Sequence, residues 1–338
     1  MKTLADYNVK FYIPSYGRTE MSKQTTIVRL ARCPETRYMW KVFIRPSEIE
    51  WWQEFIADKL GLTAMQHIVV LPTEVQGMSS TMRFVHHFAA DTELERMICL
   101  DDDLSFRQKV LRNQNPMLPA QGLRRATDVE LCQAFTWMCT ALDDTAVGSA
   151  HLMSVTGQES YYDADNCEVI TDMVSGTNIA TCPSRTASFT YIGEFWEDVV
   201  THGDVAHCLQ QASKGYHNVI NTVTIAQDRG NMDEGGSTAA QGGSARRRDN
   251  ISRATRALQR QFEDAVVPFL CGEGTAEEVL HARYFLWKLV HRFNDNDHVT
   301  LTQELWAAYG VKFAREHAYV MLLNKFNGDN GAFRKIRR

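Results

Sequence analysis

The sequence predicts an α/β fold with a mainly parallel central sheet flanked by helices, followed by a helical C-terminal region. Two observations carry this prediction. Apolar, strand-like runs begin at residues 9, 38, 67 and 97, and a helix-like stretch fills each interval between them. Alternating strands and helices at this spacing are typical of βαβ units and a parallel sheet. The runs IVVL and MICL lack polar alternation, which indicates strands covered on both faces.

The first hundred residues divide into strands and helices in turn. The predicted strands are Val9–Ile13, Tyr38–Ile44, His67–Leu71 and Met97–Leu100. The predicted helices between them are Glu20–Ala31, Glu48–Leu60 and Ser79–Ala90. The second helix has the clearest pattern, because the apolar side chains in WWQEFIADKL recur at helical spacing.

The rest of the chain continues the alternation and then becomes helical. A helix is expected at Asp128–Leu142, behind the capping residue Thr127. Further strands are expected at Ala150–Val155, Glu168–Val174, Asn178–Thr181, Ala187–Ile192 and Val219–Ala226, with a helix at Asp204–Gly215. Residues 228–250 are rich in Gly and Ser, which predicts a flexible loop. We therefore expect a sheet domain over 1–227, this loop over 228–250, and helices over 251–338.

Composition excludes several classes of protein. There is no run of about 18 apolar residues and no signal-peptide pattern, so we expect no membrane span. The net charge of −5 argues against a protein whose whole surface coats nucleic acid. The eight cysteines form no CxxC pair, which indicates reduced, mostly buried thiols. These features predict a cytoplasmic protein, in the host cytoplasm if the source is viral.

Three consecutive carboxylates, Asp101, Asp102 and Asp103, follow the fourth predicted strand. Ligands of open α/β sheets bind beyond the carboxyl ends of the strands. Adjacent carboxylates repel one another, so a cation is expected among them. Hard oxygen ligands suit Mg²⁺ or Mn²⁺, and these ions suit a diphosphate. If strand alternation continues through the triplet, Asp101 and Asp103 share a face and Asp102 points away. A charged surface turn is the alternative interpretation.

The loop after the first predicted strand has the residues of a nucleotide site. Pro14, Ser15, Tyr16 and Arg18 offer backbone donors, an aromatic face for a base and a guanidinium for phosphate. A tight turn before a helix is the alternative. The chain has no GxxxxGK[ST] and no GxGxxG after the first strand, which argues against a P-loop NTPase and a dinucleotide-binding fold.

Together, IPSYGR after the first strand, LDDD after the fourth, and a later acid opening a helix that ends in Gly-Tyr resemble a GT-A glycosyltransferase. The resemblance implies a Rossmann-like fold whose first loop receives the nucleotide of an activated sugar. It implies that Asp101 and Asp103 hold Mn²⁺ or Mg²⁺ on the diphosphate, with Asp102 beside them, and that the metal acts as a Lewis acid on the leaving nucleotide. Arg18 and Arg83 would then contact the donor.

The same resemblance implies an acid beside the acceptor. Asp204, which opens the helix ending in Gly-Tyr, is the first candidate, and Glu197 and Asp198 are the alternates. This acid would be a general base in an inverting enzyme, or would orient the substrates in a retaining one. An N-cap is the alternative role for Asp204. Asp228 and His217 are candidates for a further metal ligand.

The pattern IPSYGR…RP.E…LDDD is most similar to the phage-type TET-associated glycosyltransferases, which act on hydroxymethylated pyrimidines in DNA. This similarity implies a nucleotide-sugar donor, with UDP expected, and a double-stranded DNA acceptor bearing a base such as 5-hydroxymethylcytosine. The alternatives are transfer to a protein, lipid or glycan, and a non-catalytic nucleic-acid-binding module with a degenerate nucleotide pocket. Gly203, where an acid is more usual, and the helical C-terminal third depart from the family pattern.

A cluster of arginines follows the predicted loop. Its members are Arg246, Arg247, Arg248, Arg253, Arg256 and Arg260, with Asp249 the only acid among them. The last three recur at helical spacing and fall on one helix face. Such a stripe could track DNA phosphates without reading bases. A solvated helix face is the alternative.

Overall fold

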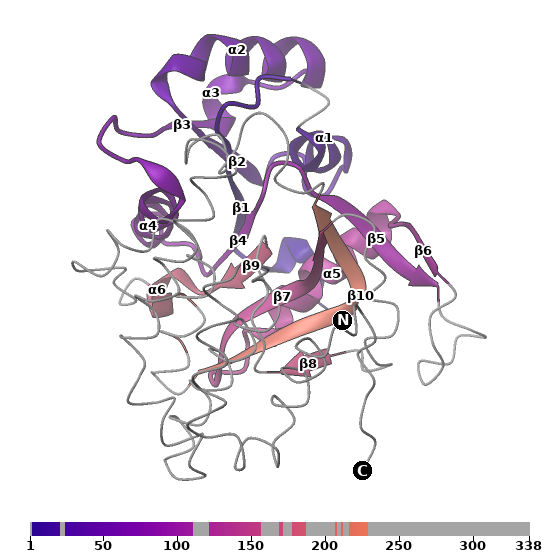
Figure 1. The fold of residues 1–338 in the computed structure, drawn as a ribbon. Coiled ribbons are helices and arrows are strands. Elements are labelled where there is room, and N and C mark those ends of the chain that lie inside the picture. The colour runs from indigo at the N-terminus through magenta and orange to yellow at the C-terminus, as the bar shows by residue number, and fades with distance from the viewer. Residues whose placement is uncertain are drawn as a thin grey trace, which may run out of the picture.

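The predicted α/β class is confirmed in a computed structural model (Figure 1). The structure describes residues 2–20, 24–110, 122–156, 169–171, 178–186, 207, 211 and 216–228. These residues form one ten-stranded sheet, and the strands along its main path run in the order β3-β2-β1-β4-β9-β7-β10-β5-β6. Helices pack on both faces of this sheet.

The first part of the sheet is parallel, as the sequence predicts. It contains β1 (Val9–Pro14), β2 (Trp40–Ile44), β3 (Ile68–Val70) and β4 (Arg96–Leu100). Strand β1 pairs with β2 on one side and β4 on the other, so that Phe11 lies opposite both Trp40 and Ile98. The ends of β1 and β4 therefore meet at the same edge of the sheet.

The connections between these strands are helical, close to the predicted bounds. They contain α1 (Thr25–Arg32), α2 (Ile49–Glu54) with the π-helical turn η4 (Phe55–Lys59), α3 (Ala64–His67) and α4 (Gly77–Ala90). The short helices η1 (Leu4–Asp6) and η3 (Pro46–Glu48) precede β1 and α2.

Strand alternation distributes the apolar side chains over both faces. Phe11 and Ile13 of β1 join a large core that also includes Leu30 of α1 and Phe135 of α5 (Asp128–Ala141). Tyr12, between them, points to the other face and packs in a second core with Val85 of α4. The helices α1, α2 and α5 thus cover one face, and α4 covers the opposite one.

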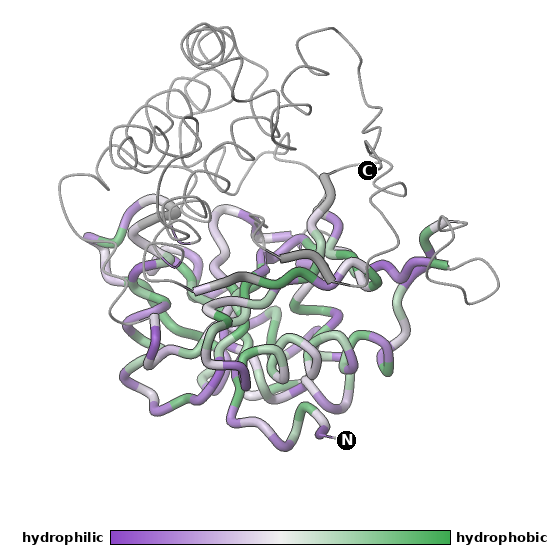
Figure 2. Tube along the Cα trace, turned by 90° about the horizontal axis from the view of Figure 1, so that it is seen from below, coloured by the Kyte–Doolittle hydropathy of each residue, from purple (hydrophilic) through white to green (hydrophobic). Residues whose placement is uncertain are grey.

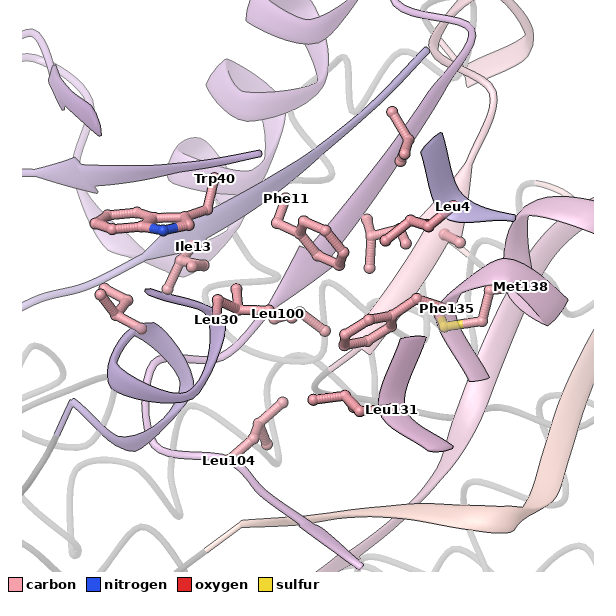
Figure 3. Close-up of a cluster of buried hydrophobic side chains, with 14 of the residues drawn as sticks. Leu4, Phe11, Ile13, Leu30, Trp40, Leu100, Leu104, Leu131, Phe135 and Met138 are labelled. Atoms are coloured by element: carbon pink, nitrogen blue, oxygen red, sulfur yellow. The ribbon is translucent and has the colours of Figure 1, made fainter. Parts of the chain in front are cut away.

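The larger core explains why the parallel strands are continuous apolar runs. Phe11 and Phe135 pack edge to face with ring centroids 4.7 Å apart, and Leu4, Leu30 and Leu100 surround them (Figure 3). The hydrophobic segments lie in the interior of the described chain and the hydrophilic ones along its outer turns (Figure 2). Burial of this apolar surface is the main favourable contribution to folding.

Beyond β4 the sheet is mixed. The strand β9 (Asn178–Thr181) lies antiparallel between β4 and β7 (Val147–Thr156). The strand β10 (His217–Asp228) runs parallel to β7 and antiparallel to β8 (Val169–Thr171) and β5 (Ser105–Val110), which pairs with β6 (Gly122–Arg125). The expected parallel arrangement therefore holds for β1–β4 and for the β7–β10 pair, whereas β5 and β6 were not predicted from the sequence.

Helix α5 begins where the sequence predicts. The Thr127 hydroxyl accepts from the Glu130 backbone N–H at 3.2 Å, and the Glu130 carboxylate accepts from the Thr127 N–H at 2.9 Å. This reciprocal capping satisfies donors that the first helical turn leaves open. The short helix α6 (Pro183–Thr186) follows β9.

Several predictions fall on residues outside the described ranges. These include the strand at 187–192, most of the helix at 204–215 (of which His207 and Gln211 are described as helical), the loop beyond Asp228 and the C-terminal helices. The division into 1–227, 228–250 and 251–338 remains a prediction, and β10 includes Asp228, the first residue of the expected loop. The five described cysteines are free and buried, as expected. Within the described ranges, no helix combines the length and apolar character that a membrane crossing requires.

Candidate active site

The loop after β1 and the acidic triplet after β4 lie together at the carboxyl edge of the sheet. The Ser15 Oγ donates to Asp102 Oδ2 at 2.5 Å. The Arg18 guanidinium donates from Nη1 to Asp102 Oδ1, and the same nitrogen lies 2.8 Å from Asp103 Oδ2. Two segments that are distant in the sequence therefore form one polar cluster.

The expected orientation of the triplet is wrong. Strand β4 ends at Leu100, and Asp102 and Asp103 lie in a turn, so strand alternation does not extend into the triplet. Asp102 and Asp103 are both buried and both contact Arg18, while Asp101 is partly exposed. Asp102 is thus the carboxylate held most firmly by the protein itself.

The start of α1 fixes the backbone of this turn. The Thr26 N–H donates to the Asp102 carbonyl oxygen at 3.1 Å, and the Thr26 hydroxyl donates to the Asp101 carbonyl oxygen at 2.6 Å. The same hydroxyl accepts from the Leu104 N–H at 2.9 Å, and the Thr25 hydroxyl donates to the Leu104 carbonyl oxygen at 3.0 Å. The first turn of α1 therefore fixes the turn that presents the carboxylates.

Gln24, the residue before α1, ties the first loop to the same cluster. Its side-chain Nε2 donates to the Arg18 carbonyl oxygen at 2.7 Å and to Ser15 Oγ at 3.2 Å. Gln24 is fully buried, and its Oε1 has no hydrogen-bond partner within the described part of the chain. An unpaired buried amide oxygen costs free energy. The two hydrogen bonds donated by Nε2 are therefore the contacts that hold the Gln24 side chain in this position.

Burial and charge act against one another within the cluster. Burial raises the pKa of Asp102, and the hydrogen bonds and charge of Arg18 and Ser15 oppose that rise. Burial acts to lower the pKa of Arg18, but the carboxylates of Asp102, Asp103 and Asp101 outweigh it and raise that pKa. Arg18 is therefore a permanent positive charge inside the acidic turn.

The outer part of the first loop presents an exposed aromatic ring. Tyr16 is 41% exposed, and the Arg45 guanidinium lies 5.7 Å from its ring centroid. The buried Glu48 carboxylate holds the loop, because it accepts from the Gly17 N–H at 2.7 Å and from the Arg45 N–H at 3.0 Å. Gly17 has a φ of 64°, a conformation that glycine adopts at no steric cost.

Other predicted site residues occupy different places. Pro14 is the buried last residue of β1, and Arg83 is exposed on α4, which packs on the sheet face opposite α1. Asp228 ends β10 next to Gln227, which pairs with Ser105 just after the acidic turn. His217 begins the same long strand, at the end opposite Asp228, and its role as a metal ligand stays a prediction from the sequence.

The remaining candidates lie outside the described residues. They are Asp204, Glu197 and Asp198 for the acceptor side, and Arg246, Arg247, Arg248, Arg253, Arg256 and Arg260 for DNA. Their roles stay predictions from the sequence.

The acidic turn fits one common way of holding a divalent metal. Among the described residues, no group of three or more His, Cys, Asp or Glu side chains is arranged to hold a metal ion. Mg²⁺, however, is usually bound by one or two carboxylates together with water and substrate phosphates. Asp101 and Asp103 can supply two such carboxylates, although Asp103 already contacts Arg18.

Gln24 and the two threonines that follow it were not predicted as site residues from the sequence. A signal was present, because paired threonines opening an amphipathic stretch are typical residues for binding backbone groups near a helix start. Nothing in the sequence indicates that these hydroxyls bind the turn after β4, some 75 residues further along the chain.

No protein-family model and no curated protein sequence matches this chain. Among solved structures, it is similar to glucosyl-3-phosphoglycerate synthase from Mycobacterium tuberculosis in complex with Mg²⁺ and uridine diphosphate. That likeness has a TM-score of 0.39 and 10% identity, and covers 80% of this chain and 82% of that one. It is also similar to S. aureus TarS 1–349 in complex with UDP-GlcNAc, with a TM-score of 0.41, 10% identity, and coverage of 96% and 93%. Values this low establish neither a shared family nor a shared activity.

Proposed function

We propose that this chain is a glycosyltransferase that transfers a sugar from a nucleotide-sugar, with UDP as the nucleotide and Mg²⁺ or Mn²⁺ as the cofactor. One observation carries the proposal. The loop with the exposed Tyr16 and the acidic turn with Asp101 and Asp103 are held together at the carboxyl ends of neighbouring parallel strands. This edge is where open α/β sheets bind ligands.

Different residues of the cluster would contact different parts of the donor. Tyr16 offers an aromatic face to the base, and Arg45 adds a positive charge beside it. Asp101 and Asp103 would hold the metal, which when bound supplies a positive charge that stabilises the departing diphosphate. Asp102 lies beside them, and its bonds to Ser15 and Arg18 hold the turn in place.

The acceptor side rests on the sequence. We propose that Asp204, with Glu197 and Asp198 as alternates, receives the proton of the acceptor hydroxyl or orients it. A general base must lie within hydrogen-bond reach of that hydroxyl. Replacing Asp204 with Asn should abolish transfer to the acceptor while leaving slow donor hydrolysis by water in place.

We further propose that the acceptor is a hydroxymethylated pyrimidine in double-stranded DNA. The support is the similarity of IPSYGR…RP.E…LDDD to enzymes of that kind and the arginine cluster over residues 246–260. Such arginines would bind phosphates in a salt-dependent manner. The base would be modified in the major groove or flipped out of the helix.

One experiment tests both levels of the proposal. The protein is incubated with Mn²⁺, a panel of nucleotide-sugars and DNA containing 5-hydroxymethylcytosine, and the digested nucleosides are analysed by mass spectrometry. A nucleoside heavier by one hexose or pentose is expected. Unmodified nucleosides, together with sugar transfer to a protein, lipid or glycan in parallel incubations, would overturn the DNA acceptor alone. Absence of both transfer and donor hydrolysis would overturn the enzyme assignment.

The arginine cluster is tested by duplex binding. Arg246→Ala, Arg247→Ala and Arg248→Ala combined should weaken binding to duplex DNA and reduce its dependence on salt concentration. The matched control removes three exposed charges elsewhere, at Arg32, Lys59 and Arg125. Equal binding by the two triple variants would overturn the role of the cluster.

A further inference from the structure

Arg18 is not in the environment expected of an arginine that is available to bind a substrate phosphate. It is only 7% exposed, and its Nη1 contacts both Asp102 and Asp103. A guanidinium that binds a substrate phosphate must present its N–H groups to that substrate. The contacts of Arg18 are directed into the acidic turn instead.

Both the backbone carbonyl group and the guanidinium of Arg18 are held by other residues. Gln24 Nε2 binds its carbonyl oxygen at 2.7 Å, and the two carboxylates bind its guanidinium. Ser15 then holds the remaining oxygen of Asp102 at 2.5 Å. Arg18 is therefore held by Gln24, the residue before α1, and by the turn after β4, which Ser15 binds in turn.

The charges explain what this arrangement accomplishes. Three adjacent carboxylates repel one another strongly when two of them are buried. One guanidinium neutralises part of that charge without any bound ligand. Any second cation that approaches Asp103 must share this carboxylate with Arg18 and meets repulsion from it.

We propose that Arg18 is an internal counter-cation of the acidic turn, which keeps the turn folded without metal and competes with the divalent cation for Asp103. This inference rests on the proposed metal-dependent function of the same site. It changes the role of Arg18 from a donor-phosphate contact to a residue that sets the affinity for the metal. The competition makes metal binding weak until a diphosphate adds its own oxygens.

The test measures metal binding without any nucleotide. Mn²⁺ binding is followed by the electron paramagnetic resonance signal of the free ion for the native chain, Arg18→Gln and Arg18→Lys. The Gln variant should bind Mn²⁺ at least about tenfold more tightly. Near a protein surface, the repulsion between the Arg18 charge and a cation a few Å away is larger than the free energy that corresponds to this factor. The Lys variant, which keeps the charge, should stay near the native affinity.

A matched control and a second readout keep the result interpretable. Arg32→Gln removes the same charge from an exposed position on α1 and should leave Mn²⁺ affinity unchanged. Because Arg18→Gln leaves carboxylates unneutralised, its melting temperature should be low without metal, and added Mn²⁺ should raise it more than in the native chain. A variant that folds only in the presence of Mn²⁺ would support the proposal in the same way.

The outcomes separate this inference from the proposed function. If the native chain binds Mn²⁺ and Arg18→Gln binds it equally or more weakly, the internal counter-cation is overturned and the metal site stands. If neither protein binds Mn²⁺ with or without a UDP-sugar, the metal-dependent function and this inference fall together.

Discussion

Ser15 and Asp102, which are 87 residues apart in the sequence, share a hydrogen bond of 2.5 Å that joins the end of β1 to the end of β4. Both residues are buried, and Asp102 keeps its other oxygen on Arg18. This contact explains how two loops form one site. The parallel pairing of β1 and β4 brings the loops together, and the hydrogen bond fixes their relative position.

Removing the Ser15 hydroxyl should therefore weaken the fold as well as the site. Ser15→Ala leaves one oxygen of a buried carboxylate without its donor, which should lower the free energy of unfolding by about 1–3 kcal/mol. Urea unfolding followed by circular dichroism measures this change. Thr19→Ala, an exposed hydroxyl in the same loop, is the control and should change stability by less than about 0.5 kcal/mol. Equal effects of the two substitutions would contradict the buried hydrogen bond.

The buried His86 should make stability depend on pH. Burial, with the nearby charge of His87 adding to it, lowers the pKa of His86 to about 3 from its usual 6.5. Between these two values the unfolded chain binds the proton and the folded chain does not. Stability should therefore fall as the pH falls below 6.5, by about 1 kcal/mol per pH unit from this group.

The measurement compares urea unfolding at pH 7 and pH 5 for the native chain, His86→Gln and His87→Gln. His87 is exposed and is the smaller cause of the shift, so its variant should change the pH dependence less than the His86 variant does. A His86 variant with the full native dependence would contradict the lowered pKa of His86 in the folded state.

The described cysteines should resist alkylation. Burial raises the pKa of Cys139 to about 12 and also raises the pKa of Cys99 and Cys132. The thiolate is the reactive form, so these thiols are protected both by burial and by protonation. Iodoacetamide at pH 8 followed by peptide mass spectrometry should label them only after urea is added. Rapid labelling of Cys139 in the folded protein would contradict its position in the core.

The sequence predicted the strands and helices of the first hundred residues because their signals are local. The apolar runs of β1–β4 are continuous since both faces of each strand are covered, and α1, α2 and α4 fill the intervals between them. The strands β5 and β6 were missed because their sequences, SFRQKV and GLRR, are polar and show no apolar run. Their pairing with β10 and with each other determines them instead.

The candidate site was predictable in its components and not in its contacts. The sequence located the first loop and the acidic turn, because each follows a strong strand signal. The family resemblance assigned Arg18 to the donor. Strand alternation, continued past Leu100, where β4 ends, placed Asp102 on the face opposite Asp101 and Asp103. The turn, the burial of Asp102 and the roles of Gln24 and Thr26 all depend on contacts between residues distant in the sequence.

The central claim is that Asp101 and Asp103 hold the metal of a nucleotide-sugar-dependent transferase. The most direct measurement is Mn²⁺-dependent release of UDP from UDP-sugars by the native chain and by Asp101→Ala combined with Asp103→Ala. The control pair is Asp58→Ala combined with Asp91→Ala, two exposed carboxylates elsewhere. The account predicts that only the first pair loses UDP release, with both variants folded by circular dichroism. Native rates of UDP release in the Asp101 and Asp103 double variant would contradict it.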